Sequence, residues 1–228
     1  MDFYLEKFYS EFKKKYNIDV FFISDKKLKN CYFYSNYLCS KNKLKNFTAN
    51  FDKKYTAWER CFCFLKEENI NYDYVWIIED DVCVSKIDAL FNIIKKYNKI
   101  SYDLITNEIS EYLDYKDWYH WNHILDHDFE TAYKSFNCFC RLSKNLINKI
   151  FEYIEKNKNL PSYFHEILFI NVCFKYDLYV NQFEKKDKFL IRWRPEISRK
   201  EISKKINFFH PVKDIKLKKI LLKNFINL

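Results

Sequence analysis

The 228-residue sequence predicts an α/β fold with a mostly parallel central sheet flanked by helices. Helical and strand-like segments alternate through the first half of the chain, as they do in folds of this class. Segment 74–78 (Tyr-Val-Trp-Ile-Ile) is apolar on both sides, which is typical of a strand that is covered on both faces. No repeat, linker or low-complexity tract divides the chain, so we expect a single domain over residues 1–228.

Apolar periodicity and turn signals give the expected elements in chain order. Three helix starts carry capping signals, which are Thr56 with Glu59, Ser85 with Asp88, and Ser143 alone. We expect helices over 3–16, 56–68, 89–96, 145–156, 161–174 and 215–228, and strands over 19–24, 31–37, 74–78, 103–107, 135–142 and 189–193.

The sequence contains no glycine, although an average usage of about 7% would give roughly 16 in a chain of this length. Turns that need a positive φ must therefore use asparagine, aspartate or another residue. The absence of glycine also excludes the glycine-rich phosphate loops of P-loop and dinucleotide-binding proteins. If the protein binds phosphate, a metal ion and Lys or Arg side chains must hold it.

Charge and cysteine usage narrow the class of protein further. The formal net charge of +9 suits an anionic ligand, nucleic acid or an anionic membrane surface. The eight cysteines include no Cys-x-x-Cys pair, so their spacing does not indicate a zinc site. We identify neither a signal peptide nor a long apolar span, and we therefore expect a cytoplasmic protein with reduced cysteines.

Three adjacent acids, Glu79, Asp80 and Asp81, directly follow the strand expected over 74–78. In open α/β sheets, ligands bind at the carboxyl ends of the strands. Three neighbouring carboxylates repel one another, so a bound cation or a cationic partner is the natural way to keep them ionised. The alternative is a solvated acidic turn after a buried strand.

Polar residues also end the first two expected strands. Ser24 and Asp25 lie at the end of the first strand, and Asn36 lies near the end of the second. These are the positions at which a nucleotide would lie in such a sheet.

Glu166 falls in the first turn of the helix expected over 161–174. The body of this helix is nearly all apolar, so we expect the helix to be buried and its first turn to point at the middle of the domain. A favourable interaction of the carboxylate with the helix dipole is the alternative role for Glu166.

Five short motifs, taken in order, resemble those of the glycosyltransferase A fold, which is Rossmann-like. They are Lys-Tyr-Thr-Ala-Trp-Glu at 54–59, Val-Trp-Ile-Ile-Glu-Asp-Asp-Val at 75–82, Cys-Arg-Leu-Ser at 140–143, His-Glu at 165–166 and Phe-His-Pro-Val-Lys at 209–213. The chain is most similar to the compact sugar transferases encoded by large DNA viruses and some protists. The resemblance covers roughly residues 17–214.

The resemblance implies a metal-dependent glycosyltransferase that moves a sugar from a nucleoside-diphosphate donor to a hydroxyl of a glycan or glycoprotein, without a nucleic-acid partner. Residues from about 17 to 107 would form the donor half and residues 108–214 the acceptor half. By the same resemblance, Asp81, Glu79 and His210 would hold Mn²⁺ or Mg²⁺, and Glu166 would be the catalytic base. The residues expected to bind the donor are Ser24, Asp25, Asn36, Lys54, Asp80 and Lys213.

Two alternatives to this function stay open from the sequence. The missing glycines suit a non-catalytic domain of the same fold that binds a sugar or nucleotide. The net charge and the acid cluster together suit a metal-dependent nuclease or phosphotransferase.

The pattern of apolar and basic residues predicts a basic amphipathic helix over the C-terminal segment 215–228. Its apolar face either docks on the core or lies on an anionic membrane surface as a peripheral contact. The residues of that face are Leu217, Ile220, Leu221, Phe225 and Leu228.

Overall fold

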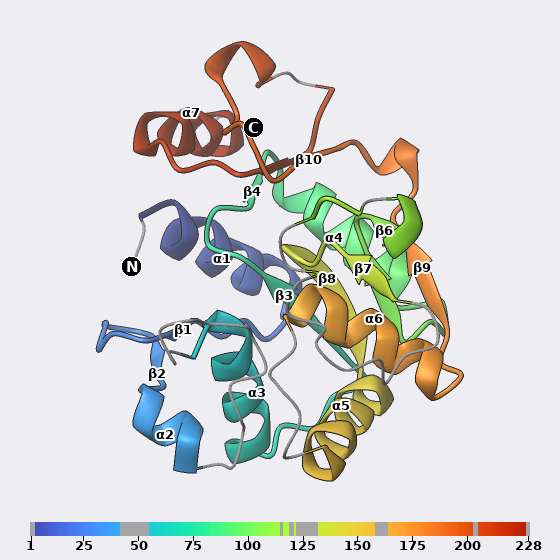
Figure 1. Ribbon diagram of the computed structural model, residues 1–228. Coiled ribbons are helices and arrows are strands. Elements are labelled where there is room, and N and C mark those ends of the chain that lie inside the picture. The colour runs from blue at the N-terminus through green and yellow to red at the C-terminus, as the bar shows by residue number, and fades with distance from the viewer. Residues whose placement is uncertain are drawn as a thin grey trace. The chain divides into compact units, whose positions relative to one another are not determined.

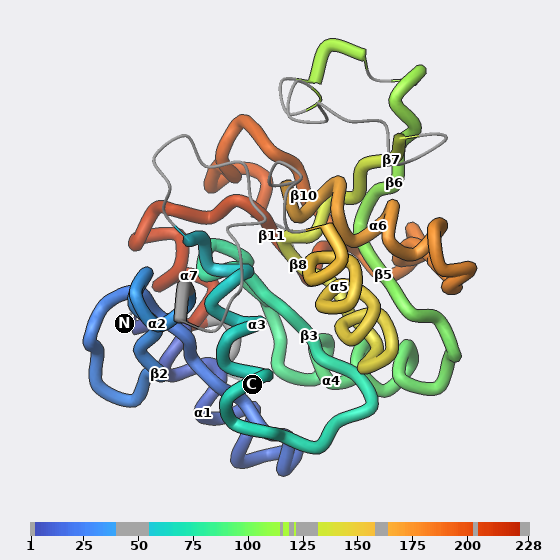
Figure 2. The backbone as a smooth tube through the Cα atoms, turned by 60° about the horizontal axis from the view of Figure 1, so that its bottom comes forward, coloured from blue at the N-terminus to red at the C-terminus, as the bar shows by residue number. Residues whose placement is uncertain are grey.

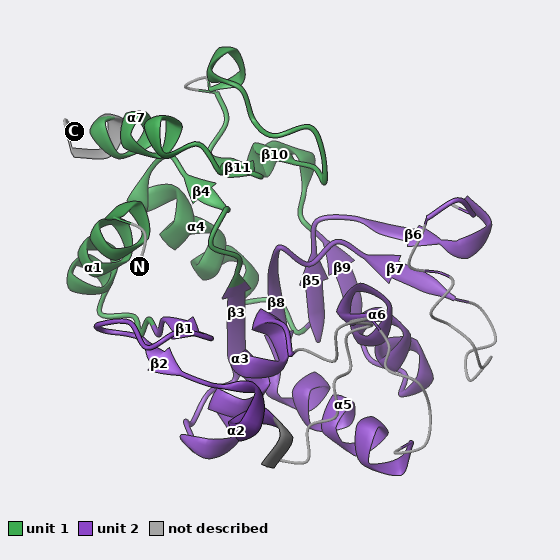
Figure 3. Cartoon of the chain, turned by 60° about the vertical axis from the view of Figure 1, so that its left-hand side comes forward, with its two compact units in different colours: residues 1–20, 78–101, 183–228 green, residues 21–77, 102–182 purple. Residues whose placement is uncertain are grey.

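The computed structural model confirms the α/β class, with helices and strands interleaved along the chain (Figures 1 and 2). It describes residues 3–41, 55–114, 116–118, 121, 132–157, 164–202 and 205–226, and only the backbone of residues 40, 41 and 224–226. The chain divides into two compact units, coloured separately in Figure 3. Unit 1 contains Met1–Val20, Ile78–Ser101 and Phe183–Leu228, and unit 2 contains Phe21–Ile77 and Tyr102–Gln182. The expectation of a single domain stays a prediction.

Unit 1 combines helices with a small mixed sheet. In this sheet β11 lies between β10, which runs parallel to it, and β4, which runs antiparallel. The described elements of unit 1 are α1 (Phe3–Tyr16), β4 (Cys83–Val84), α4 (Ile87–Tyr97), the 3-10 helix η3 (Lys185–Asp187), β10 (Phe189–Ile191), the 3-10 helix η4 (Arg199–Glu201), β11 (Phe208–His210) and α7 (Ile215–Ile226).

The N-terminal helix α1 has the bounds that the periodicity predicts, and it packs against α4 and α7. Its apolar stripe is buried, including Phe8 and Phe12. The hydroxyl of Tyr4 donates to the carbonyl oxygen of Val84 at 2.7 Å and accepts from the amide of Val84 at 2.6 Å. Helix α1 is therefore joined directly to strand β4.

Unit 2 contains the larger sheet, in the order β3-β8-β5-β9, and two further strand pairs, β1–β2 and β6–β7. Helices α5 and α6 lie side by side (Figures 1 and 2). The described elements of unit 2 are β1 (Ile23–Ser24), β2 (Tyr32–Phe33), α2 (Asn36–Lys41), α3 (Ala57–Glu67), β3 (Tyr74–Ile78, whose last residue belongs to unit 1), β5 (Leu104–Thr106), β6 (Ile109–Glu111), the 3-10 helix η1 (Tyr112–Asp114), β7 (Tyr133–Ser135), β8 (Phe139–Ser143), α5 (Lys144–Lys156), α6 (His165–Lys175) and β9 (Val180–Gln182).

The core of unit 2 forms where the helices pack against this sheet. Phe62 of α3, Ile147 of α5 and Phe169 of α6 are fully buried there together with Leu104 and Leu142 of the strands. The apolar body of α6 is buried, as the sequence predicts. In β3, by contrast, only Ile77 is buried and the other residues are half-buried.

The three-stranded and four-stranded sheets are both mixed, whereas the sequence predicts a mostly parallel central sheet. Strand β5 pairs in parallel with β9 but antiparallel with β8. Parallel neighbours need a long crossover connection, usually a helix. Between β5 and β8 in the chain lie β6 and β7, which pair antiparallel, and β8 then runs antiparallel to β5.

Two of the three capping predictions are confirmed. Thr56 and Glu59 form the capping box of α3, and the Ser143 hydroxyl accepts from the amide of Leu146 at the start of α5. The prediction for Ser85 is wrong. Helix α4 begins after Lys86, and the Ser85 hydroxyl donates to the carbonyl oxygen of Ile206 at 3.2 Å.

As the absence of glycine requires, other residues occupy the described positions with positive φ. All but one of them are asparagine or aspartate, which adopt the left-handed region most readily after glycine. The residues are Asn17, Asn30, Asn69, Asp177 and Lys188.

Helix α7 docks within unit 1 through its apolar side, where Leu221 is fully buried. We expect Leu221→Ala to lower the free energy of unfolding by about 2–5 kcal/mol, because it leaves a cavity in a packed core. The exposed Ile215 of the same helix is the matched control, and Ile215→Ala should change stability by less than about 0.5 kcal/mol. Urea unfolding followed by circular dichroism compares the two variants, and equal effects would contradict the docked helix.

Candidate metal centre

The acidic segment predicted to bind a cation forms a turn at the end of β3. The amide of Val82 donates to the carbonyl oxygen of Glu79 at 3.1 Å and closes the turn. Two contacts from the C-terminal part of unit 1 fix its backbone. Lys218 Nζ donates to the Asp80 carbonyl oxygen at 2.9 Å, and the Val212 amide donates to the Asp81 carbonyl oxygen at 2.9 Å.

His210 is the last residue of β11, and pairing with β10 sets its position opposite Ile191. Its Nδ1 lies 2.9 Å from the carbonyl oxygen of Arg192. A carbonyl oxygen can only accept, so Nδ1 carries the proton and donates to it. In the neutral imidazole, the lone pair of Nε2 is then available on the opposite side of the ring.

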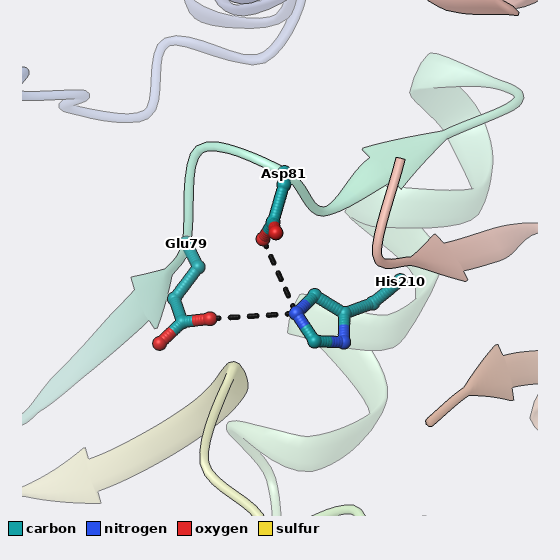
Figure 4. A group of neighbouring side chains, drawn as sticks. All are labelled: Glu79, Asp81 and His210. Carbon is teal, nitrogen blue, oxygen red and sulfur yellow. Dashed lines mark ion pairs between the residues drawn. The ribbon is translucent and has the colours of Figure 1, made fainter. Parts of the chain in front are cut away.

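The Nε2 atom of His210 faces two carboxylates (Figure 4). It lies 3.4 Å from Glu79 Oε2 and 3.2 Å from Asp81 Oδ1. One ligand atom from each of the three residues fits within a span of 4.8 Å. His210 is buried and the two acids are half-buried, so solvent screens the group only in part.

The surroundings of Asp81 keep it ionised at neutral pH. Burial acts to raise the pKa of this carboxyl, but His210 in its protonated form, Lys213 and Lys218 outweigh burial and lower the pKa below its usual range. Lys213 Nζ is 4.0 Å from Asp81 Oδ2 and is itself exposed. Asp81 Oδ1 is buried, and no hydrogen bond to it is found among the described residues.

These residues suit a divalent cation. Two carboxylate oxygens and a neutral imidazole nitrogen are all acceptors, and without a cation among them they repel one another. An oxygen-rich set with one imidazole fits Mn²⁺ or Mg²⁺ better than a structural zinc ion. The buried Oδ1 atom of Asp81 supplies a ligand that no hydrogen-bond donor uses. Cation binding by the turn after β3 stays a prediction.

The predicted donor-binding residues Ser24, Asp25 and Asn36 belong to unit 2, whereas Asp80 and Lys213 belong to unit 1. Ser24 lies in β1, and its hydroxyl accepts from the amide of Lys26 at 3.1 Å. Asp25 is exposed. Lys54 lies outside the described residues.

Asn36 has a structural contact that the sequence did not reveal. It begins α2 instead of following a longer strand. Its Oδ1 atom accepts from the guanidinium of Arg60 at 2.8 Å, and the same guanidinium donates to the carbonyl oxygen of Tyr34 at 2.9 Å. Donor binding by Asn36 stays a prediction, and the side chain would have to keep or exchange its contact with Arg60.

Glu166 lies in the first turn of α6, as predicted, and its side chain is buried in unit 2. The preceding His165 stacks on Trp58 with ring centroids 4.3 Å apart. Asn171 fixes the same helix to β7, because it donates to the Tyr133 carbonyl oxygen at 2.7 Å and accepts from the Tyr133 amide at 3.0 Å. These contacts hold α6 in one orientation. The role of Glu166 as a base stays a prediction.

Helix α7 presents its apolar side to unit 1, with Leu217, Leu221 and Leu222 buried. Of the two alternatives that the sequence leaves open for this helix, the structure has the one in which it docks on the protein. The side chains of Phe225 and Leu228 lie outside the described residues. Peripheral membrane contact stays a prediction that would rely on exposed Lys216 and Lys219. No helix in the described ranges has the length and apolar character needed to cross a membrane.

Two residues that support the site escaped the sequence interpretation. Lys218, which holds the acidic turn, is one of many lysines in the chain and lies on a helix whose basic residues are expected in solvent. Arg192, whose carbonyl oxygen orients His210, contributes through its backbone, and a backbone contact leaves no mark on residue type.

A scan of the sequence against protein-family models finds no match, and a search of curated proteins finds no similar sequence.

Proposed function

We propose that the protein is a metal-dependent glycosyltransferase that uses a nucleoside-diphosphate sugar as its donor. The observation that carries the proposal is the convergence of Glu79 and Asp81 on Nε2 of His210, with Lys213 beside Asp81. The acids follow a strand and the histidine and lysine come from a distant segment, in the order of the motifs that resemble the glycosyltransferase A fold. We also propose that the α/β fold of this protein is the glycosyltransferase A fold.

The residues of the centre have distinct roles in this proposal. Asp81, Glu79 and His210 would hold Mn²⁺ or Mg²⁺, which when bound neutralises negative charge on the diphosphate of the donor. Lys213 is exposed and 4.0 Å from Asp81, so its ammonium group can contact a phosphate without leaving the centre. Asp80 is exposed at the tip of the turn and would contact the donor directly.

The remaining donor contacts are proposed for Ser24, Asp25, Asn36 and Lys54. Such polar side chains suit the hydroxyl and base groups of a nucleotide. The acceptor in this proposal is a hydroxyl of a glycan or glycoprotein, and Glu166 would take its proton if the reaction inverts configuration at the sugar.

A donor panel tests the proposal. The purified protein is incubated with nucleoside-diphosphate sugars with and without Mn²⁺, and release of the nucleoside diphosphate is measured. We expect release for one class of donor that depends on Mn²⁺ and stops with EDTA. Metal-independent donor binding without turnover would instead favour a non-catalytic binding domain, and tight, salt-sensitive DNA binding without donor binding would favour a nuclease or phosphotransferase.

A further inference from the structure

We propose that Arg192 and Glu201 form a positioning pair that orients the imidazole of His210 for metal binding. Neither residue belongs to the metal centre itself. The proposal rests on the proposed function in one respect, which is that His210 binds a metal through Nε2. The orientation of the ring can be measured without any metal.

The backbone of Arg192 contacts His210 twice. Its amide donates to the His210 carbonyl oxygen at 3.1 Å, which continues the pairing of β10 with β11. Its carbonyl oxygen accepts from His210 Nδ1 at 2.9 Å. The first contact fixes the main chain of His210, and the second fixes both the rotation of the ring and the position of its proton.

The guanidinium of Arg192 holds the loop that follows β10. It forms a bidentate pair with Glu201, at 2.6 Å to Oε1 and 2.9 Å to Oε2. It also donates to two backbone carbonyl oxygens of the loop, that of Pro195 at 2.7 Å and that of Glu196 at 3.2 Å. A planar group with a fixed fork of donors can satisfy these acceptors together, and a lysine ammonium cannot.

Glu201 fixes the far end of the same loop. Its Oε2 atom accepts from the amide of Ser198 at 2.9 Å and from the Ser198 hydroxyl at 2.8 Å. Arg192 and Ser198 lower the pKa of this carboxyl to about 2, so it is charged at neutral pH. The buried Ile197 donates its amide to the Pro211 carbonyl oxygen at 2.9 Å, which joins the loop to the residue after His210.

These contacts close the loop of residues 192–201, which begins beside His210 and is joined to Pro211 through Ile197. The Arg192–Glu201 pair is half-exposed, so its contribution to global stability is expected to be small. Its main effect is on the orientation of the His210 ring, because loss of the pair frees the peptide group that accepts the hydrogen bond from Nδ1. Partners that orient a metal-binding histidine in this way change metal affinity about 10- to 100-fold when they are mutated.

The test compares Glu201→Gln and Arg192→Lys with a matched control. Glu184→Gln removes a carboxylate of unit 1 that pairs with Lys96 and Lys186 but contacts neither His210 nor the loop. Nitrogen-15 NMR of the imidazoles at alkaline pH, without metal, reports which ring nitrogen carries the proton, and His210→Asn assigns the signal. Isothermal titration then measures Mn²⁺ affinity, and thermal melts measure stability.

We expect the wild type and Glu184→Gln to show His210 protonated at Nδ1. Glu201→Gln and Arg192→Lys should show a mixture of tautomers and about 10- to 100-fold weaker Mn²⁺ binding, with small changes in melting temperature. An unchanged tautomer in both variants would overturn the positioning role. If the wild type binds no Mn²⁺, the proposed function fails at that step, and the tautomer measurement still decides whether the pair orients His210.

Discussion

Asp81→Asn should reduce metal-dependent turnover of the donor by roughly 1,000-fold, because loss of about 4 kcal/mol of charge stabilisation corresponds to that factor. The substitution keeps the shape of the side chain and removes a negative charge that faces His210 and Lys213. His210, Lys213 and Lys218 lower the pKa of Asp81, so the variant should lose some stability at neutral pH but should remain folded. Donor turnover at saturating Mn²⁺ and Mn²⁺ titration measure the two effects.

Asp88→Asn is the matched control for this experiment. Asp88 also belongs to unit 1 and has a lowered pKa, which results from its contacts with Lys15 and Tyr16 on α1. Its replacement should leave Mn²⁺ affinity and turnover unchanged. Asp81 would be excluded as a ligand if Asp81→Asn retained full activity and normal Mn²⁺ affinity.

Glu166→Gln should lower the rate of sugar transfer by roughly 100-fold or more while donor and metal binding stay normal. The amide keeps the size of the side chain but cannot accept a proton from the acceptor hydroxyl. Because Glu166 is buried in the first turn of α6, the substitution also tests the alternative in which the carboxylate only stabilises the helix. In that case stability would fall and the rate of transfer per folded molecule would not.

The measurements for Glu166 are single-turnover transfer, donor affinity and melting temperature. Glu152→Gln provides the control in unit 2, since Glu152 pairs with Lys149 and Lys156 along α5 and is not a predicted site residue. A loss of donor affinity in Glu166→Gln with a normal transfer rate would move Glu166 out of the role of base.

The local elements with strong patterns could be predicted from the sequence. Helix α1 and strand β3 have the expected bounds, because an amphipathic stripe and a run of β-branched and aromatic residues act over a few neighbours. The acids of the candidate centre were found by their place after β3. His210 was found only through the order of the motifs, since no local pattern connects it to Asp81.

Strand pairing could not be predicted in the same way, because it depends on partners far along the chain. The pattern over 19–24 yields only the two-residue strand β1, and β4 is also only two residues long, which is too short to be predicted from the pattern alone. Strand β4 exists because β11 pairs with it, and that pairing brings His210 toward the acidic turn. The positions of Lys218 and of the Arg192 carbonyl oxygen depend on the same long-range packing.

We propose that Glu79, Asp81 and His210 form one metal-binding centre. Crystals grown with Mn²⁺ and a nucleoside diphosphate, measured at the manganese absorption edge, test it most directly. We predict one anomalous peak enclosed by the two carboxylates and Nε2 of His210, and its loss in Asp81→Asn. A well-occupied manganese peak elsewhere on the chain, with none at these three side chains, would contradict the claim.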